Sequence, residues 1–266
     1  MQLKLFVVDA FTRALFGGNP AAVVPLQRWL PDPLLQSIAA ENNLSETAFF
    51  VPEGDGFHLR WMTPVREVTF CGHATIATSF VILNLLQPGR DEVRYRTLCG
   101  ELTVRRNGDL LAMEAPNWEP SLVPPPPLLI SALGRTPREV LAARDYLAVF
   151  ETEEEIRALT PDMAGLMKLD RDGVIVTAPG TRSDFVSRYF GPQVGIPEDP
   201  ATGSAHSTLA PYWARRLGKS RLHALQLSSR VGELFCEVRG DRVITSGRAV
   251  KYLEGTLDLP PSLLAP

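Results

Sequence analysis

Hydrophobic residues along this chain fall mostly into short runs that are typical of β-strands, interrupted by two longer apolar segments that are typical of buried helices. Strands are predicted at residues 3–9, 47–51, 58–62, 146–150, 173–177 and 184–190. Apolar helices are predicted at 72–86 and 203–217, and shorter helices follow the Pro-Asp pairs at 31–41 and 161–169. Because a helix without a polar face is normally buried, the pattern predicts strands wrapped around central helices.

The two halves of the chain repeat one another. Gly-Glu-Leu at 100–102 and Gly-Asp at 108–109 recur at 232–234 and 240–241, displaced by 132 positions. Pro-Asp and Thr-Ala pairs recur at a displacement of 130, and Arg60 and Pro64 recur as Arg188 and Pro192 at 128. Since the matches keep their order, we predict an α+β fold of two similar domains related by a pseudo-two-fold axis, each a β-barrel around a central apolar helix.

Prolines mark the middle of the chain. Six of the 23 prolines lie between Pro116 and Pro127, and the last four are consecutive. A proline run favours polyproline II and is not expected to join a helix or a central strand. We therefore predict domains at 1–116 and 131–266 joined by a linker at 117–130, with one extreme terminal segment able to cross to the other domain.

Composition excludes several classes of protein. The chain has 266 residues, 45% of them hydrophobic, with 27 basic and 30 acidic side chains, and no basic run that would hold nucleic acid. No apolar stretch reaches the roughly 18 residues that span a bilayer, and no signal-peptide pattern precedes Asp9, so we expect a cytoplasmic protein without membrane contact. The three cysteines are far apart and are expected to be free thiols.

Two turns rich in small residues open the predicted apolar helices, at 70–75 and at 200–206. Small side chains leave the first-turn N–H groups accessible, and the helix dipole favours an anion there. If the halves are related by a two-fold axis, a cleft between them is the natural ligand site. The alternative interpretation is that Ser, Thr and Gly at these places only cap the helices.

The repeat also exposes one chemical asymmetry. Glu46 aligns with Val176 in the second half. A carboxylate at a position that accepts valine is a candidate acid/base in a partly dry cleft, although an exposed glutamate at a strand entrance is the alternative. Cys71 at a helix start is a further candidate base or nucleophile, without a partner thiol. No P-loop, GxGxxG or GxSxG motif occurs, and the histidines form no HExxH or Cys-paired set, so no metal site is predicted.

Four motifs together resemble the PhzF family of phenazine biosynthesis-like proteins. They are Asp9-Ala10-Phe11-Thr12 with Gly18-Asn19-Pro20-Ala21, Asn43-Leu44-Ser45-Glu46-Thr47-Ala48-Phe49, Cys71-Gly72-His73-Ala74-Thr75, and Glu198-Asp199-Pro200-Ala201-Thr202-Gly203-Ser204-Ala205. The resemblance implies the diaminopimelate-epimerase-like fold and a homodimer that needs no cofactor. It also implies a cofactor-independent isomerase acting on a small carboxylate-bearing substrate.

The same resemblance implies roles for individual residues. Glu46, His73 and Asp199 are the expected catalytic residues. The expected substrate-binding residues are Asn19, Ser45, Gly72, Ala74, Thr202, Gly203 and Ser204.

Three alternatives remain. One is a non-catalytic binding protein for small anions on the same fold. Another is a Cys-assisted epimerase or racemase, although the second half offers Ala201 or Asp199 where a partner thiol would stand. The third is a hydrolase using Ser204 and His206, which lacks a nucleophile elbow.

Overall fold

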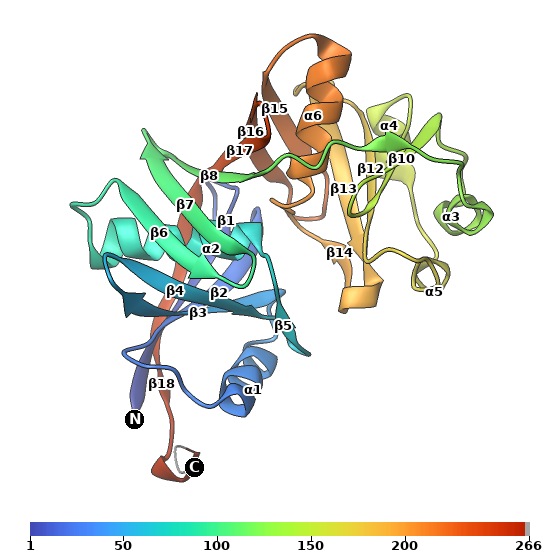
Figure 1. The fold of residues 1–266 in the computed structure, drawn as a ribbon. Helices are drawn as coiled ribbons and strands as arrows, with labels where there is room; N and C mark the ends of the chain where they lie inside the picture. Colours follow the sequence, from blue (N-terminus) through green and yellow to red (C-terminus); the bar gives the residue numbers. More distant parts are fainter. Residues whose placement is uncertain (264–266) are drawn as a thin grey trace. The chain divides into compact units, whose positions relative to one another are not determined.

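The computed structural model describes residues 1–263 and divides the chain into two compact units (Figure 1). The first unit contains residues 1–114 together with the segment that begins at Ser246. The second unit is the continuous segment Ala115–Thr245. Each unit has its own strands, helices and core.

The strands of the first unit pair in the order β18–β1–β2–β3–β4–β6–β7–β8. The pairs β2–β3 and β4–β6 are parallel and the others are antiparallel; β5 pairs antiparallel with β4. The bounds are β1 (Gln2–Ala10), β2 (Asn19–Pro25), β3 (Glu46–Glu53), β4 (Gly56–Met62), β5 (Glu67–Val68), β6 (Glu92–Thr97), β7 (Gly100–Asn107), β8 (Leu110–Pro116) and β18 (Ala249–Asp258). The helices are α1 (Asp32–Asn42) and α2 (Gly72–Phe80), and α2 continues as the π-helix η1 (Val81–Leu86); a 3₁₀ turn η3 (Pro261–Leu263) follows β18.

The strands of the second unit pair in the order β9–β10–β11–β12–β13–β15–β16. The pairs β11–β12 and β13–β15 are parallel, and β14 pairs antiparallel with β13. The bounds are β9 (Ser121–Leu122), β10 (Glu139–Ala142), β11 (Tyr146–Val149), β12 (Val174–Pro179), β13 (Phe185–Gly191), β14 (Ile196–Asp199), β15 (Arg221–Gln226), β16 (Gly232–Arg239) and β17 (Arg242–Gly247). The helices are α3 (Pro127–Leu133), α4 (Glu153–Ala158), α5 (Met163–Leu166), the 3₁₀ turn η2 (Pro192–Val194) and α6 (His206–Leu217).

The two units repeat one plan of strand pairing. In each, an antiparallel pair is followed by a parallel pair, an antiparallel pair, a second parallel pair and a hairpin. Helices occur at equivalent places as well, with α2 preceding β6 and α6 preceding β15. The duplication inferred from short sequence identities is therefore present in the topology, and the fold is α+β.

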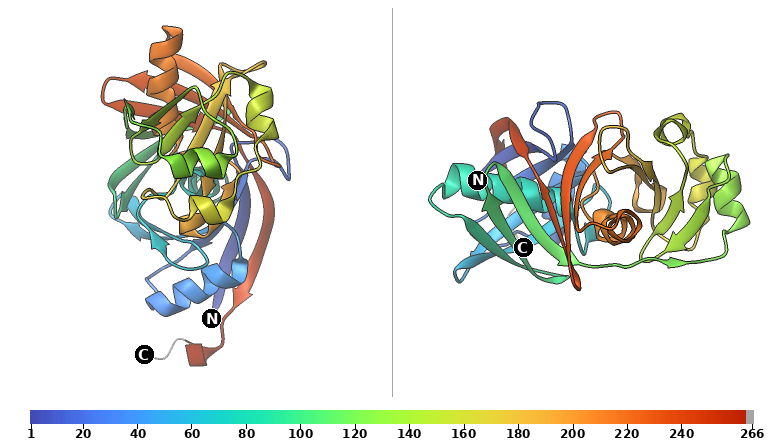
Figure 2. Two further views of the ribbon diagram at one scale, coloured as in Figure 1. Left: turned by 90° about the vertical axis from the view of Figure 1, so that its right-hand side faces the viewer. Right: turned by 90° about the horizontal axis from the view of Figure 1, so that it is seen from above.

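Both predicted apolar helices are buried within their own units. All of α2 from Gly72 to Ser79 is buried, and it packs on β1, β2, β3 and β18. Helix α6 packs on β15 and β16 (Figure 2). Within this unit Trp213 stacks on Phe185, with ring centroids 5.7 Å apart. The prediction that α6 is apolar all round is wrong for its last turn, where Arg215 and Arg216 face solvent. Cations are favoured there because the C-terminal end of a helix is the negative end of its dipole.

The proline-rich segment is part of the second unit, which differs from the linker predicted at 117–130. The N–H groups of Asn117 and Trp118 donate to the carbonyls of Asp241 and Ser207, at 2.9 and 3.0 Å. Pro127 begins α3, contrary to the expectation that the run joins no helix. At the first helical position the missing N–H would have had no partner in the helix, and the fixed φ of proline is already helical.

The C-terminal segment returns to the first unit, although the predicted second domain extends to 266. Strand β18 pairs with β1 from Gln2–Asp258 to Ala10–Ala249 (Figure 1). The sequence interpretation allowed such a crossing of one terminal segment without deciding which. Within residues 1–263, no helix combines the length and the apolar character that a transmembrane span requires.

Candidate active site

Glu46 is a buried carboxylate at the first position of β3. Only 7% of the residue is exposed, which contradicts the alternative of a surface glutamate. Glu46 lies opposite Ala21 of β2, and Val176 lies opposite Ala148 of β11, so each residue faces an alanine of the strand that pairs in parallel with its own. The first unit therefore carries a carboxylate where the second unit carries an apolar core residue.

His73 connects Glu46 to a second polar side chain. Its Nε2 lies 3.2 Å from Oε2 of Glu46, and its Nδ1 lies 3.1 Å from the side-chain nitrogen of Asn19. Because an amide nitrogen can only donate, Nδ1 accepts this bond and the ring proton is on Nε2, facing the carboxylate. The three predicted residues Asn19, Glu46 and His73 therefore form one buried group, in which Asn19 and His73 share a hydrogen bond and Glu46 lies within ion-pair distance of His73.

Cys71 joins this group from the start of α2. It is the N-cap residue, it is 5% exposed, and its Sγ lies 3.5 Å from Nδ1 of His73. One donor atom from each of Glu46, Cys71 and His73 lies within 4.8 Å of the others. All three residues are candidates from the sequence, but the convergence of their donor atoms was not predicted. The available signal was the spacing Cys-x-His, which places both side chains on the first turn of one helix.

The turn between β1 and β2 positions Asn19 beside His73. Gly18 has a φ of +57°, and a Cβ at this position would lie 2.0 Å from the carbonyl oxygen of Ala10. The Asp9 carboxylate, 2% exposed, accepts a hydrogen bond from the N–H of Phe16 at 3.0 Å. A glycine and a buried acid therefore fix the backbone just before Asn19.

Ser45, Gly72 and Ala74 adjoin the catalytic candidates in the chain. Ser45 is half-buried before Glu46, while Gly72 and Ala74 are buried on either side of His73. No side-chain hydrogen bond caps α2 within the described residues. The interpretation that its opening residues serve only as side-chain caps is therefore not supported for α2.

In the second unit, Asp199 lies at the end of β14 and is 5% exposed. Its Oδ2 accepts a hydrogen bond from the hydroxyl of Thr202 at 2.5 Å. Gln226, which is fully buried, accepts the N–H of Thr202 at 2.7 Å and donates to the Asp199 carbonyl at 2.7 Å. Sequence reasoning missed Gln226; the only signal was a polar residue on the buried face of the strand at 221–226, in phase with Leu222 and Ala224.

Gly203 and Ser204 lie in a turn that precedes α6, since the helix begins at His206 and not at 203. The fully buried His206 donates from Nδ1 to the Thr202 carbonyl at 2.9 Å, and burial lowers its pKa to about 4. The helix N-terminus again has no side-chain cap in the described part of the chain. The bond from Nδ1 leaves Nε2 as the nitrogen that could act as a base, and no described residue forms a hydrogen bond to Nε2, so the Ser204–His206 contact that a hydrolase requires is not formed.

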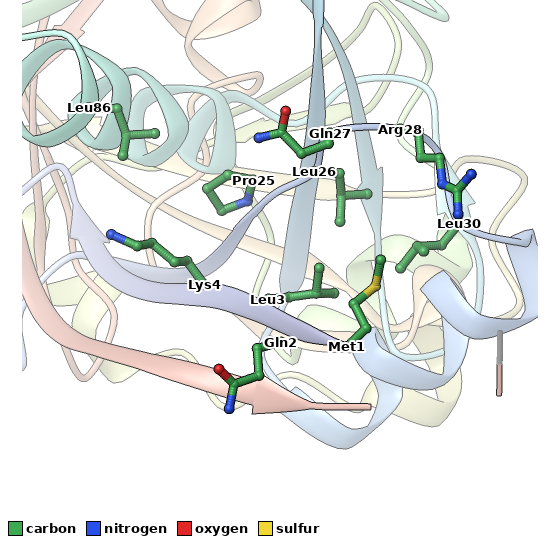
Figure 3. A pocket seen from close by; sticks show the side chains of 10 residues that line it. All are labelled: Met1, Gln2, Leu3, Lys4, Pro25, Leu26, Gln27, Arg28, Leu30 and Leu86. Carbon is green, nitrogen blue, oxygen red and sulfur yellow. The ribbon is translucent and has the colours of Figure 1, made fainter. Parts of the chain in front are cut away.

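A separate cavity of about 540 Å³ opens elsewhere on the first unit (Figure 3). It is lined by residues 1–4 and 25–28, with Leu30 and Leu86. None of the predicted site residues lines it. Its volume is ordinary for a small-molecule pocket, but it holds no convergent acid/base group, so it is not the candidate active site.

Comparison with known proteins finds related sequences and structures over nearly the whole chain. The family model of the phenazine biosynthesis-like proteins (PhzC-PhzF) matches residues 8–255. A Pseudomonas aeruginosa protein named as an uncharacterized isomerase is 54% identical over 97% of this chain and 100% of its own length. The crystal structure of a PhzF-family protein from Enterococcus faecalis matches with a TM-score of 0.94 and 44% identity, covering 97% of this chain and all of that one.

A more distant structural match shows that proteins with little sequence identity share the fold. The structure of a probable proline racemase from Agrobacterium radiobacter matches with a TM-score of 0.62 at 12% identity, over 97% of this chain and 94% of that one. At this identity the match shows a shared fold alone. The family match and the full-length relatives, three of which are bacterial proteins named isomerases, show more than the fold. The chain is an enzyme of the PhzF family of phenazine biosynthesis-like proteins.

Proposed function

We propose that this enzyme isomerises a small carboxylate-bearing substrate by moving a proton from one carbon atom to another, with Glu46 as the acid/base. The observation that carries the proposal is the buried contact of 3.2 Å between Glu46 and His73 at the start of α2. A buried ionised carboxylate is costly, so Glu46 gains by accepting a proton from a substrate C–H bond. The ring of His73, whose Nε2 lies 3.2 Å from Oε2 of Glu46, offsets part of that cost.

The developing negative charge needs stabilisation elsewhere. When a proton leaves the carbon next to a carboxylate, the electron pair moves into the carboxylate and forms an enediolate. The backbone N–H groups of Gly72 and Ala74, at the positive end of the α2 dipole, are suited to bind this charge. In a β,γ-unsaturated acid the enediolate shares its charge with the γ-carbon, and Glu46 returns a proton there, so the double bond moves and atoms and charge balance without a redox step. Exchange of the Glu46 proton with solvent between the two transfers carries deuterium into the product in deuterated water.

We assign substrate binding also to Asn19, Ser45, Thr202, Gly203 and Ser204, and a catalytic role to Asp199. Two observations in the second unit support this assignment. The hydrogen bonds of Gln226 fix the turn that carries these residues, and the N-terminus of α6 lacks a side-chain cap within the described residues.

Deuterium incorporation tests the proposal while the substrate is still unidentified. A library of small carboxylic acids is incubated with the enzyme in deuterated water and analysed by mass spectrometry. We expect one class of acids to gain deuterium at carbon, and Glu46→Gln to reduce the rate by about 10²–10⁴-fold, the usual contribution of a positioned acid/base. The exposed Glu41 on α1 provides the matched control, because Glu41→Gln makes the same chemical change away from the site.

The outcomes separate the alternatives. Exchange at an undiminished rate in Glu46→Gln would refute the assignment of the base. A ligand that raises the melting temperature of the wild-type protein, but never gains deuterium, would favour a binding protein. The contact of Cys71 with His73 favours one further candidate, Cys-assisted epimerisation. That mechanism predicts inversion at one carbon, lost in Cys71→Ser, in place of proton movement between two carbons.

A further inference from the structure

Three chemically different metal-binding side chains meet at the start of α2. Glu46 offers a carboxylate, Cys71 a thiol and His73 an imidazole, each from a residue that is no more than 7% exposed. We propose that these three residues bind Zn²⁺ and that the ion inhibits the enzyme; the inhibitory part rests on the proposed function of Glu46.

The distances suit one ion. Zinc–sulfur bonds of about 2.3 Å and zinc–nitrogen bonds of about 2.0–2.1 Å, at a tetrahedral angle, place the two donor atoms about 3.6 Å apart. The observed separation of Cys71 Sγ and His73 Nδ1 is 3.5 Å. A carboxylate oxygen of Glu46 belongs to the same group of donor atoms within 4.8 Å. Because Asn19 now donates to Nδ1 and Glu46 faces Nε2, binding of the ion at Nδ1 requires the Asn19 amide to leave that nitrogen and the Glu46 carboxylate to turn toward it.

The charges of the donor set also favour this ion. A thiolate and a carboxylate together neutralise Zn²⁺, which lowers the cost of placing the ion in a buried site. The loss of the thiol proton on binding accounts for the second negative charge. A thiolate and an imidazole select zinc over Mg²⁺ or Ca²⁺, which prefer oxygen ligands. The fourth position of the tetrahedron remains for water or a substrate carboxylate.

Binding would remove the base that the reaction uses. Once a lone pair of Glu46 is bonded to Zn²⁺, it no longer accepts a proton from carbon. Inhibition is then reversible, because a chelator that removes the ion restores the free carboxylate.

The other two thiols of the chain serve as internal controls. Cys236 is buried in the second unit, where burial raises the pKa of its thiol to about 12. Cys99 is exposed after β6, and its Sγ contacts the hydroxyl of Thr97 at 3.1 Å. Within residues 1–263, neither belongs to a group of three donors that could hold a metal ion.

Cobalt provides the direct test, since Co²⁺ occupies zinc sites and a Co²⁺–thiolate bond gives a charge-transfer band. The full-length protein is freed of metal, titrated with Co²⁺, and then challenged with Zn²⁺. We expect one equivalent of Co²⁺ to produce the band in the wild type and in a Cys99→Ser/Cys236→Ser variant, and Zn²⁺ to displace it. Cys71→Ser should show no band. Glu46→Gln should bind at least about tenfold more weakly, which is the smaller loss seen when even an outer partner of a zinc site is removed.

The readouts keep this inference separate from the proposed function. No band in the Cys99→Ser/Cys236→Ser variant, or an intact band in a folded Cys71→Ser, would overturn the zinc site. If Cys71→Ser does not fold, Zn²⁺ should still raise the melting temperature of the wild type more than that of Glu46→Gln, and an equal rise would overturn the site. Zinc binding that leaves deuterium exchange at its full rate would overturn inhibition. A band in a protein that exchanges no substrate proton would refute the proposed function while supporting the site.

Discussion

Acid should destabilise the second unit through one histidine. His206 is fully buried, and its neutral ring donates from Nδ1 to the Thr202 carbonyl. Protonation would place a charge on Nε2 in the core, where no described residue forms a hydrogen bond to it. Lowering the pH therefore favours unfolding of the second unit, because the unfolded state accepts the proton on His206 more readily than the folded core does.

The magnitude follows from the difference between the folded and unfolded states. Burial lowers the pKa of His206 from 6.5 to about 4 in the folded protein. A depressed pKa means that the stabilising contribution is complete above 6.5 and is lost as the pH falls from there toward 4. The linkage relation gives a loss of about 2 kcal/mol near pH 5, rising to about 3 kcal/mol once the pH reaches the folded value.

A substitution isolates this contribution from those of the carboxylates. His206→Asn keeps a side-chain N–H close to the position of Nδ1 but does not titrate. In the first unit the equivalent residue is Thr75, whose hydroxyl donates to the Cys71 carbonyl. The corresponding position therefore accepts a neutral side chain that donates the same hydrogen bond. Urea unfolding followed by circular dichroism, at neutral pH and near pH 5, measures the free energy of unfolding of both proteins.

We expect the wild type and His206→Asn to differ in stability at neutral pH and in how far that stability falls toward pH 5. The variant is less stable at neutral pH, because it loses the ring packed 5.9 Å from Phe185. Its stability should then fall by about 2 kcal/mol less than that of the wild type on going to pH 5. An equal fall in the two proteins would show that His206 is not what makes the second unit acid-sensitive.

Two further substitutions test the backbone around the candidate residues. Gly18→Ala places a Cβ against the carbonyl of Ala10 and should cost at least about 3 kcal/mol of unfolding free energy, whereas Gly108→Ala, at a φ of +62° with open space around it, should cost about 1 kcal/mol; equal losses in thermal or urea unfolding would show that the close approach is not tight. Gln226→Leu leaves the buried N–H and carbonyl of the Asp199–Thr202 turn without their partner, so the unfolding free energy should fall by about 3 kcal/mol and the turn amides should exchange hydrogen faster. Unchanged exchange in the turn would contradict the clamping role of that glutamine.

Much of the fold could be predicted because the chain contains its plan twice. Short identities at constant order predicted two similar halves, and the strand pairings repeat in the structure. The assignment of the chain ends to units could not be predicted, because the strand at 249–258 contains no buried residue and its sequence therefore specifies neither a core face nor a neighbouring strand. The proline run misled for a related reason: Pro127 is compatible with a linker and equally with the first position of a helix.

The site was predictable where the halves differ. Glu46 against Val176 pointed to a buried carboxylate, and the structure places it beside His73. The convergence of Cys71 and the clamp by Gln226 were not predictable, because both depend on side chains from separate segments meeting in space. A polar residue on an otherwise apolar strand face, such as Gln226, indicates a buried hydrogen-bonding role.

The return of β18 to β1 has a consequence for biosynthesis. The first unit lacks one of its edge strands until residues 249–258 leave the ribosome, and the second unit, which is continuous and ends at Thr245, is complete a few residues earlier. Domains generally fold as units during synthesis, N-terminal ones first. Here the first unit, although it is begun first, is completed last, so through the synthesis of the whole second unit its sheet has an open edge, which is a surface that other strands or chaperones can bind.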